Sequence, residues 1–405
     1  MLSGKHILVG ISGGIAAYKM PELIRQLRKA GAEVRVTTTR NALEFVTELT
    51  LQTLSGAKVY HDVFAAINEH STEHISLPDW ADLMLIAPAT ANVLGKMAHG
   101  IADDALTTTF CAMRKPVVIA PAMNDKMYAC PATQEAIRTL AAWNNVTMLD
   151  CAEGELACGT NGKGRMQEPQ VLIEAIRYAL TPHTLAGKNV LLTSGPTVEA
   201  IDPVRYISNH SSGKMGSALA LESWYRGANV TIISGPVHQY PEVPILWGEA
   251  NRLHIVRVTD AAQMANAAQD AFTNAQLTIL CAAVADFTPE QCADQKIKKQ
   301  PQQTELCLAL KQTTDIAATL GQAKQDGQVL VGFALETNNE QVNAQHKLVS
   351  KNLDWIVLNS TRDQGAGFGC DTNKVTLFSR KGETIEIALQ SKPAIARAIL
   401  DNCCD

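Results

Sequence analysis

A loose internal repeat constrains the fold of this chain more than any other feature of its sequence. Gly4–Gly14 (GKHILVGISGG) and Gly187–Thr197 (GKNVLLTSGPT) each place Gly-Lys before an apolar run and a Ser-Gly turn. Leu23–Thr39 and Leu219–Pro236 each continue with a helix-like segment, a Gly-Ala turn and a β-branched run. A strand, a turn, a helix and a second strand form one βαβ unit. Two copies predict an α/β chain of two Rossmann-like, doubly wound domains that join near residue 185.

Length and composition exclude several classes of protein. The 405 residues are enough for about two or three domains, and 46% of them are apolar, so each domain can bury a core. A net charge of −5 argues against nucleic-acid binding. No apolar run approaches the ~18–20 residues of a membrane span. The ten cysteines include no C-x-x-C pair, which argues against a zinc site and a disulfide framework. We therefore expect a cytoplasmic protein that binds neither nucleic acid nor membrane.

Small polar residues follow the predicted strands of the first half. Ser12, Thr90 and Asn124 each come soon after an apolar run that is typical of a buried parallel strand. Ligands of open parallel sheets bind outside the carboxyl ends of the strands. Backbone N–H groups at the Ser-Gly-Gly turn suit a phosphate, although a plain βα turn would have the same residues. The run Val34–Thr39 ends in three threonines whose hydroxyls could hold phosphate or ribityl oxygens. These positions predict a mononucleotide-like pocket.

Two titratable residues of the first half lie near these strands. His74 comes just before a predicted strand, where a histidine taken alone is more often a surface or hydrogen-bonded residue than a catalytic one. Cys158 lies in the Gly-rich stretch Ala157–Met166 (ACGTNGKGRM), which predicts a flexible loop or flap. A cysteine there could be a nucleophile, a proton donor or a residue without a role.

Together these segments resemble the flavin-dependent cysteine decarboxylases, which include phosphopantothenoylcysteine decarboxylase. The matching segments are Gly10–Lys19 (GISGGIAAYK), His74, Ala87–Asn92 (APATAN), Pro121–Tyr128 (PAMNDKMY) and Ala157–Met166. The resemblance implies a flavodoxin-like domain with bound FMN. The implied cofactor contacts are Ser12, Gly13, Gly14, Thr38, Ala89 and Thr90.

The same resemblance implies three catalytic residues and a reaction. His74 is implied as the active-site base, Asn124 as the anchor of the substrate carboxylate and Cys158 as the proton donor. A carboxylate beside an amide nitrogen lacks an electron sink, and oxidation of the neighbouring thiol to a thioaldehyde supplies one. FMN can accept that hydride and return it after CO₂ is lost, so no external nicotinamide is needed.

The second half contains an unusual polar stretch, Arg205–Gly216 (RYISNHSSGKMG). It is rich in hydrogen-bond donors and ends where a helix over Ser217–Tyr225 is predicted. Anions suit a helix N-terminus backed by donors, although a long surface loop would have a similar composition. Ser211–Lys214 is not the end of a P-loop, because Met215 follows the lysine where Ser or Thr is required.

Charged residues follow or flank the other predicted elements of this half. The run Leu277–Asp286 predicts a buried strand with Asp286 at its end, which could help place Mg²⁺ or could be a helix N-cap. Lys296 belongs to a short basic run, and most such runs are solvated. A helix over Gln341–Lys351 would place Lys347 and Lys351 on one face.

These segments resemble phosphopantothenate–cysteine ligases, by SGPT, DPVRYISNHSSGKMG, AAVADF, KIKK, VGFALETNN and KNLDWIVLN. The resemblance implies that CTP activates 4′-phosphopantothenate as an acyl-cytidylate, which L-cysteine converts to 4′-phosphopantothenoylcysteine. Lys296 is implied to neutralise charge in the first step, and Asn209 and Arg205 to bind the intermediate and phosphopantothenate. Mg²⁺ is implied at Asp286. The implied CTP site comprises Leu280, Cys281, Ala282, Asp286, Thr314, Asp315, Ile316, Ala317, Phe333, Lys347 and Lys351.

Almost the entire chain thus resembles the bifunctional coenzyme A biosynthesis proteins of bacteria. Residues 1–185 are expected to form an FMN-dependent decarboxylase domain, and residues 186–405 a CTP-dependent ligase domain. The resemblance also implies a homo-oligomer with flavin sites between subunits. Two alternatives remain at this point. An NAD-dependent dehydrogenase should have a fuller glycine fingerprint and a ribose-binding acid, and a flavin-binding regulatory protein would show no turnover.

Overall fold

The computed structural model describes residues 2–64, 73–155, 159, 161–298, 305–360, 365–367 and 369–404. The chain divides into two compact units. The first comprises Met1–Pro182 and Glu242–Asn251, and the second comprises His183–Pro241 and Arg252–Asp405. The boundary between Pro182 and His183 lies three residues before the predicted one. The division also assigns Glu242–Asn251, which comes from the predicted second domain, to the first unit.

The first unit is built on a parallel sheet of six strands in the order β3-β2-β1-β4-β5-β6. The strands are β1 (His6–Ile11), β2 (Glu33–Thr38), β3 (Val59–Tyr60), β4 (Leu83–Ala89), β5 (Val117–Pro121) and β6 (Val146–Met148). Without the two-residue strand β3 at the edge, the order is the 2-1-3-4-5 order of flavodoxin-like folds. The predicted doubly wound, flavodoxin-like domain is confirmed.

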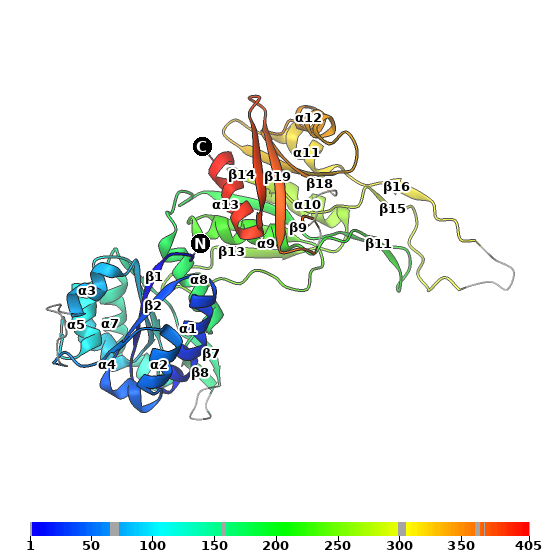
Figure 1. Ribbon diagram of the computed structural model, residues 1–405. Helices are drawn as coiled ribbons and strands as arrows, with labels where there is room; N and C mark the ends of the chain where they lie inside the picture. Colours follow the sequence, from blue (N-terminus) through cyan, green and yellow to red (C-terminus); the bar gives the residue numbers. More distant parts are fainter. Residues whose placement is uncertain are drawn as a thin grey trace. The chain divides into compact units, whose positions relative to one another are not determined.

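Helices cover both faces of this sheet, which explains why every residue of β4 is buried. Figure 1 shows α3, α4, α5 and α7 together on one side, where they enclose an apolar core of the unit. The helices are α1 (Met20–Lys29), α2 (Glu48–Ser55), α3 (Glu73–Trp80), α4 (Ala91–Ala98), α5 (Ala105–Ala112), α6 (Asp125–Ala129), α7 (Pro131–Ala141) and α8 (Pro169–Leu180). Two 3₁₀ helices, η1 (Ile15–Lys19) and η2 (Arg40–Glu44), follow β1 and β2. The predicted helix over Ala16–Ala30 therefore begins with a tighter 3₁₀ turn.

Glu242–Asn251 is a strap that completes the edge of the first unit. Leu246 forms an antiparallel bridge with Leu149, and the Trp247 N–H donates to the Met148 carbonyl at 2.9 Å. The Gln167 side chain donates to the Ile245 carbonyl at 2.8 Å and accepts from the Ile245 N–H at 3.1 Å. Trp247 packs against the apolar core that α3, α4, α5 and α7 enclose. A segment distant in sequence therefore contributes to the stability of this unit.

The second unit contains an eight-stranded sheet in the order β13-β12-β9-β14-β17-β18-β19-β20. Its strands are β9 (Asn189–Ser194), β12 (Asn229–Ser234), β13 (Leu253–Arg257), β14 (Leu277–Leu280), β17 (Val329–Glu336), β18 (Trp355–Ser360), β19 (Thr372–Ser379) and β20 (Thr384–Ser391). The first six, taken in chain order, have the dinucleotide-binding order 3-2-1-4-5-6 and are parallel. β19 and β20 add an antiparallel hairpin. The predicted second Rossmann-like domain is confirmed.

Helices also cover both faces of the second sheet. Figure 1 shows α9 (Lys214–Tyr225) with α13 (Lys392–Cys403), and on the other side α10 (Ala261–Phe272), α11 (Ile316–Ala323) and α12 (Glu340–Ser350). Two ribbons lie outside the sheet, β10 (Val198–Ala200) with β11 (Tyr206–Ser208), and β15 (Phe287–Pro289) with β16 (Leu310–Gln312). Among the described residues, no helix combines the length and the apolar character needed to cross a membrane.

The predicted strand Leu277–Asp286 is wrong in its second half. β14 ends at Leu280, because the next residues turn toward the loop after β9. The Thr193 hydroxyl accepts from the Ala282 N–H at 3.3 Å, and the Ala283 N–H donates to the Gly195 carbonyl at 2.9 Å. Asp286 is exposed and lies six residues beyond the end of the strand.

Candidate functional site

The first unit has a cavity of about 650 Å³ at the carboxyl end of its sheet. It lies where the loops after β1, β4 and β5 meet, and Gly13, Gly14, Thr90 and Asn124 line it. The order of the strands reverses between β1 and β4, so this is the switch point at which doubly wound sheets bind ligands. The volume is within the range of sites for small molecules and cofactors. We call this space the first cavity.

Ser12 holds the glycine turn at the edge of the first cavity. Its buried hydroxyl donates to the Pro88 carbonyl at 2.6 Å and accepts from the Thr90 N–H at 3.0 Å, which joins β1 to β4. A Cβ atom on Gly13 would lie 2.5 Å from the Asn41 Cβ, so no larger residue fits there. Of the predicted cofactor contacts, Gly13, Gly14 and Thr90 line the first cavity, whereas Ser12, Thr38 and Ala89 do not.

Three buried threonines end β2 and begin the loop that follows. The hydroxyls of Thr37, Thr38 and Thr39 find no hydrogen-bond partner among the described residues. A buried polar group without a partner costs roughly 1–3 kcal/mol. Phosphate or ribityl oxygens could satisfy such hydroxyls, so this part of the chain fits a bound flavin mononucleotide. Thr38 was the predicted contact, and its two neighbours have the same unsatisfied character.

Asn124 is held in the wall of the first cavity by local structure. It is the N-cap of α6, and its side-chain oxygen accepts from the Lys126 N–H at 2.9 Å. The strand β8 (Asn161–Arg165) packs beside it, and the Met123 N–H donates to the Gly164 carbonyl at 3.0 Å. A Cβ atom on Gly164 would lie 2.3 Å from the Met123 carbonyl oxygen. Glycine is therefore required for this backbone contact.

The predicted loop over 157–166 is therefore only partly correct. Asn161–Arg165 is a strand, and it pairs antiparallel with β7 (Ala152–Glu155). Its glycines serve close packing: a Cβ atom on Gly162 would lie 2.9 Å from the Asp125 Cβ. Cys158, the predicted proton donor, lies outside the described residues.

His74 does not line the first cavity. It lies in the first turn of α3 and is half-buried, so the prediction that it comes just before a strand missed this helix. α3 forms because Leu77 and Pro78 on its inner face are buried against the core. Two further residues of the wall, Lys19 and Arg165, were not predicted from the sequence. Both pair with the carboxylate of Glu168, Lys19 Nζ at 2.8 Å and an Arg165 guanidinium nitrogen at 2.6 Å from the same oxygen. Both lie inside segments that carried the resemblance.

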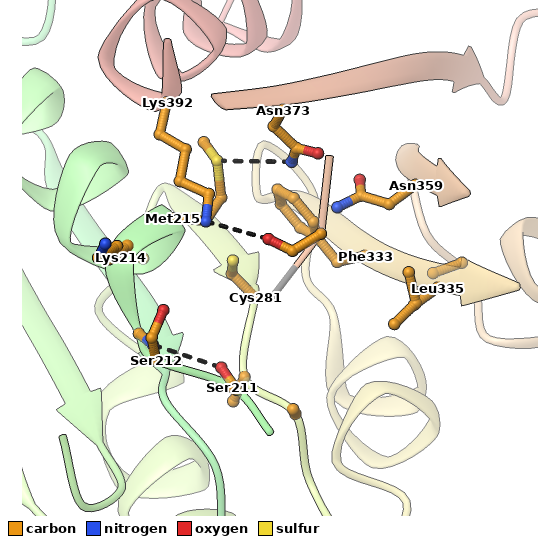
Figure 2. A pocket seen from close by; sticks show the side chains of 16 residues that line it. Ser211, Ser212, Lys214, Met215, Cys281, Phe333, Leu335, Asn359, Asn373 and Lys392 are labelled. Carbon is orange, nitrogen blue, oxygen red and sulfur yellow. Dashed lines mark hydrogen bonds between the residues drawn. The ribbon is translucent and has the colours of Figure 1, made fainter. Parts of the chain in front are cut away.

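The second unit has a smaller cavity of about 120 Å³ at the switch point between β9 and β14. Figure 2 shows its wall, to which α9, β17, β18, β19 and α13 contribute. Cys281, Ala282 and Phe333 line it, and Leu280 lies at the adjoining end of β14. Burial raises the pKa of the Cys281 thiol to about 12 despite the nearby Lys392 ammonium, so this residue is a neutral wall of the site. We call this space the second cavity; it can hold only part of a nucleoside triphosphate.

Lys214, Asn359 and Lys392 also line the second cavity, and the sequence analysis missed all three as site residues. Lys214 lies in the polar stretch that was singled out, directly after Ser211-Ser212-Gly213. No sequence pattern distinguished Lys392 or Asn359 from other polar residues. Their place at the second cavity follows from the packing of α13 and β18.

Arg205 and Asn209 do not line the second cavity, and of the two only Asn209 forms a hydrogen bond with a described residue of its wall. The Asn209 amide donates to the Ala283 carbonyl at 3.0 Å. Arg205 pairs with the buried carboxylate of Asp202 and donates to the Ile297 carbonyl at 2.8 Å. Asp202 in turn accepts from the Ile297 N–H at 3.1 Å, and the Arg205 guanidinium holds its pKa well below the usual range. This network fixes the segment that carries the exposed Lys296.

The remaining predicted CTP residues form a separate cluster at α11 and α12. Lys351 pairs with Asp315 at 2.8 Å, and Lys347 pairs with Glu336 at 2.6 Å. Asp315 is the N-cap of α11 and accepts from the Ala318 N–H at 3.0 Å. Thr314, Ile316 and Ala317 flank this cap. The described residues contain no group of three or more His, Cys, Asp or Glu side chains that could hold a metal, and Asp286 stands apart from both cavities.

Comparisons with known proteins agree with this two-part architecture. The family model described as "Flavoprotein" matches residues 1–181, and the one described as "DNA/pantothenate metabolism flavoprotein C-terminal domain" matches residues 185–405. The "Coenzyme A biosynthesis bifunctional protein CoaBC" of Vibrio cholerae is 45% identical over 399 residues, which are 98% of each chain. The protein of the same name from Bacillus subtilis is 45% identical over 403 residues, 99% of this chain and 97% of the relative. A crystal structure of the C-terminal domain of a coenzyme A biosynthesis bifunctional protein is 37% identical, with a TM-score of 0.44; the match covers 54% of this chain and 95% of that one.

Two family models divide the chain between them, and two curated relatives match it over nearly its full length. These matches decide against the two alternative functions that remained open, an NAD-dependent dehydrogenase and a flavin-binding regulatory protein. The chain belongs to the family of coenzyme A biosynthesis bifunctional proteins, enzymes that combine a flavoprotein phosphopantothenoylcysteine decarboxylase with a phosphopantothenate–cysteine ligase.

Proposed function

We propose that the first unit decarboxylates 4′-phosphopantothenoylcysteine to 4′-phosphopantetheine with FMN in the first cavity. The observation that carries this proposal is the cavity of cofactor size at the carboxyl end of the sheet. The buried, unsatisfied hydroxyls of Thr37, Thr38 and Thr39, at the end of the strand β2 that pairs with β1, support it. FMN, when bound, supplies a reversible hydride acceptor, so the substrate gains an electron sink and regains its hydride within one cycle. Gly13, Gly14 and Thr90 would hold the cofactor.

The protein's own groups bind the substrate and move the proton. Asn124 anchors the substrate carboxylate, and its N-cap hydrogen bond fixes the side chain before the substrate arrives. Cys158 supplies the proton that the product carbon needs. His74 is the base, and it reaches the site from a second copy of the chain. We therefore propose a homo-oligomer in which the flavin sites lie between subunits.

A mixing experiment tests the shared site. His74→Asn and Cys158→Ser should each abolish decarboxylation, and a mixture refolded or co-expressed together should regain part of the activity. If the mixture stays inactive while the wild type is oligomeric by light scattering, His74 and Cys158 act within one subunit or not at all.

We propose that the second unit couples 4′-phosphopantothenate to L-cysteine with CTP. The switch-point position of the second cavity and its lining by Cys281, Ala282 and Phe333 support a nucleotide there. Lys296 neutralises charge as the acyl-cytidylate forms, while Asn209 and Arg205 bind the intermediate. The Lys347–Glu336 and Lys351–Asp315 pairs open to admit the remainder of CTP. Mg²⁺ would enter bound to the phosphates of CTP, which supply oxygen ligands of the kind this ion prefers. Asp286 stands apart from the second cavity, so the described residues that line this cavity do not by themselves form a Mg²⁺ site.

These roles assign residues 1–185 to decarboxylation and 186–405 to ligation, in the cytoplasm, where coenzyme A precursors are made. One assay tests the whole proposal: purified protein, 4′-phosphopantothenate, L-cysteine and either CTP or ATP, with products weighed by mass spectrometry. We expect a yellow protein, CMP and 4′-phosphopantetheine. A colourless preparation that takes up no FMN would count against the first unit's role, and turnover with ATP alone would count against CTP.

A further inference from the structure

Lys392 is an unusually buried lysine at the second cavity. It is the first residue of α13 and only 5% exposed. Figure 2 shows its side chain reaching from α13 into the space bounded by Met215, Cys281 and Phe333. Its ammonium donates to the Gly367 carbonyl at 3.2 Å, and it forms no ion pair with a carboxylate of the described residues. A buried charge is costly unless it is paired, so this arrangement favours the binding of an anion.

The surroundings of Lys392 increase this excess of positive charge. α9 and α13 both begin at the second cavity, and helix N-termini carry partial positive charge. A lysine in the first turn of a helix is therefore unfavourable unless an anion is nearby. Asp371 lies beside the cavity, but its carboxylate is paired with Lys214 at 2.6 Å. Burial, and then the nearby Lys214 ammonium, lower the pKa of Lys392.

The opposite side of the second cavity has a different chemistry. The side-chain oxygen of Asn359 is buried and has no hydrogen-bond partner among the described residues. Phe333 adds an apolar surface next to it, as Figure 2 shows. The cavity thus offers a cation at one end and a hydrogen-bond acceptor at the other. This combination suits a ligand that carries both phosphoryl oxygens and a hydroxyl or amino group.

We propose that Lys392 binds a phosphoryl oxygen of the nucleotide in the second cavity. The proposal rests on the nucleotide function proposed above and names a residue that holds the nucleotide there. When the nucleotide binds, the Lys392 ammonium releases the Gly367 carbonyl and donates to the phosphoryl oxygen instead. The N-termini of α9 and α13, which carry partial positive charge, then lie next to the negative phosphate. The other phosphorylated substrate, 4′-phosphopantothenate, offers the same chemical group, so the experiment must distinguish the two.

Calorimetric titrations of the full-length protein test the assignment. We compare the wild type with Lys392→Met, which keeps the length of the stem, and with Lys381→Met, an exposed lysine in the turn between β19 and β20. The ligands are CTP, cytidine and 4′-phosphopantothenate. We expect Lys392→Met to weaken CTP by about tenfold or more, the order of magnitude of a lost charge-assisted hydrogen bond. Cytidine and 4′-phosphopantothenate should bind all variants equally, and Lys381→Met should match the wild type.

Each other outcome has a definite meaning. Wild-type CTP affinity in Lys392→Met overturns the proposal, and so does an equal loss of CTP and cytidine, which indicates a collapsed site. A loss confined to 4′-phosphopantothenate assigns Lys392 to the other substrate. A wild type that binds no CTP overturns the proposed function itself. If Lys392→Met does not fold, Lys392→Gln, which retains a donor, should show an intermediate loss, and full CTP affinity in that variant overturns the proposal.

Discussion

The two units place their cavities at equivalent points of similar sheets but balance charge in opposite ways. In the first cavity, Lys19 and Arg165 share the carboxylate of Glu168. In the second cavity, Lys214 forms an ion pair with Asp371, while the buried Lys392 donates a hydrogen bond to a backbone carbonyl oxygen. The first site has few unneutralised charges and many small contacts, as suits a broad, flat ring with a single phosphate. The second has a surplus of positive charge, as suits a polyphosphate.

In both units the sheet determines where the cavity lies, and the loops determine its charge and shape. Strand order alone places a cavity at β1/β4 and at β9/β14, because crossovers leave each switch point open. The residues that follow the strands then determine charge and shape. A glycine makes close backbone contact in each unit: Gly164 meets the Met123 carbonyl, and Gly235 meets the Pro196 carbonyl, where an added Cβ would lie only 1.7 Å away.

The largest effect should come from adding a methyl group at these two glycines. Gly164→Ala should push β8 away from the wall of the first cavity, and Gly235→Ala should displace the loop after β9. Overpacking of this kind costs about 1–3 kcal/mol or more, so each variant should lose roughly a hundredfold in its own activity and little in the other. Separate decarboxylase and ligase assays measure the two losses.

Gly95→Ala is the matched control for both glycine variants. It lies inside α4, and an added Cβ would meet no atom within 4 Å. This change should leave both activities intact and stabilise the helix by about 1 kcal/mol or less. If Gly164→Ala lowered both activities equally, the two cavities would not be independent, and the comparison between them would fail.

The strap provides the second largest test. Trp247 lies in the second half of the sequence but is half-buried and packs against the core of the first unit. Trp247→Ala should therefore lower the unfolding free energy of the first unit by roughly 2–4 kcal/mol, as large-to-small core changes do. Flavin release during denaturation reports that unit. Ile245→Ala on the same strap removes a side chain that is 52% exposed and should have little effect. If Trp247→Ala instead lowered the stability of the second unit more than that of the first, the strap would stabilise the second unit, and the assignment would be wrong.

Asp202→Asn tests how the second unit positions Lys296. The neutral amide keeps the shape but weakens the hold on Arg205 and on the Ile297 N–H, so ligation should fall by roughly tenfold. The pKa of Asp202 is lowered in the folded state. Its stabilising contribution is therefore complete above the ordinary aspartate pKa of about 3.9 and is lost only as the pH falls through the lower folded value. The pH profile of ligase activity should therefore show no change near neutral pH that is due to titration of Asp202. The decarboxylase activity of Asp202→Asn should equal that of the wild type.

Sequence patterns predicted the fold well because they are local. The apolar runs, the glycine turns and the intervening helices of the two βαβ copies indicate parallel strands with right-handed crossovers. The motifs also identified Gly13, Thr90 and Asn124, which the structure brings together at one cavity. The true end of β14 escaped prediction, because the Thr193 hydroxyl and the Gly195 carbonyl bind the next residues.

Long-range packing explains what the sequence did not reveal. The strap is hydrogen-bonded to β6, which lies almost a hundred residues earlier in the chain, and no local pattern in Glu242–Asn251 indicates a partner. Lys392 is a lysine in a helix start like many others, and only the packing of α13 on α9 buries it. His74 was recognised by resemblance alone, and α3 places it outside the wall of the first cavity.

The smallest expected effect concerns the shared carboxylate of the first cavity. Lys19 holds the pKa of Glu168 below its usual value, but the Glu168 side chain is 49% exposed, so the pairs should matter little. Glu168→Gln leaves Lys19 and Arg165 unneutralised and should tighten FMN by no more than about fivefold at low salt, with the gain screened at high salt. Riboflavin, which has no phosphate, should bind both proteins equally. Weaker FMN binding in Glu168→Gln would mean that Glu168 shapes the cavity instead of balancing its charge, and the contrast between the two units would then lie in shape alone.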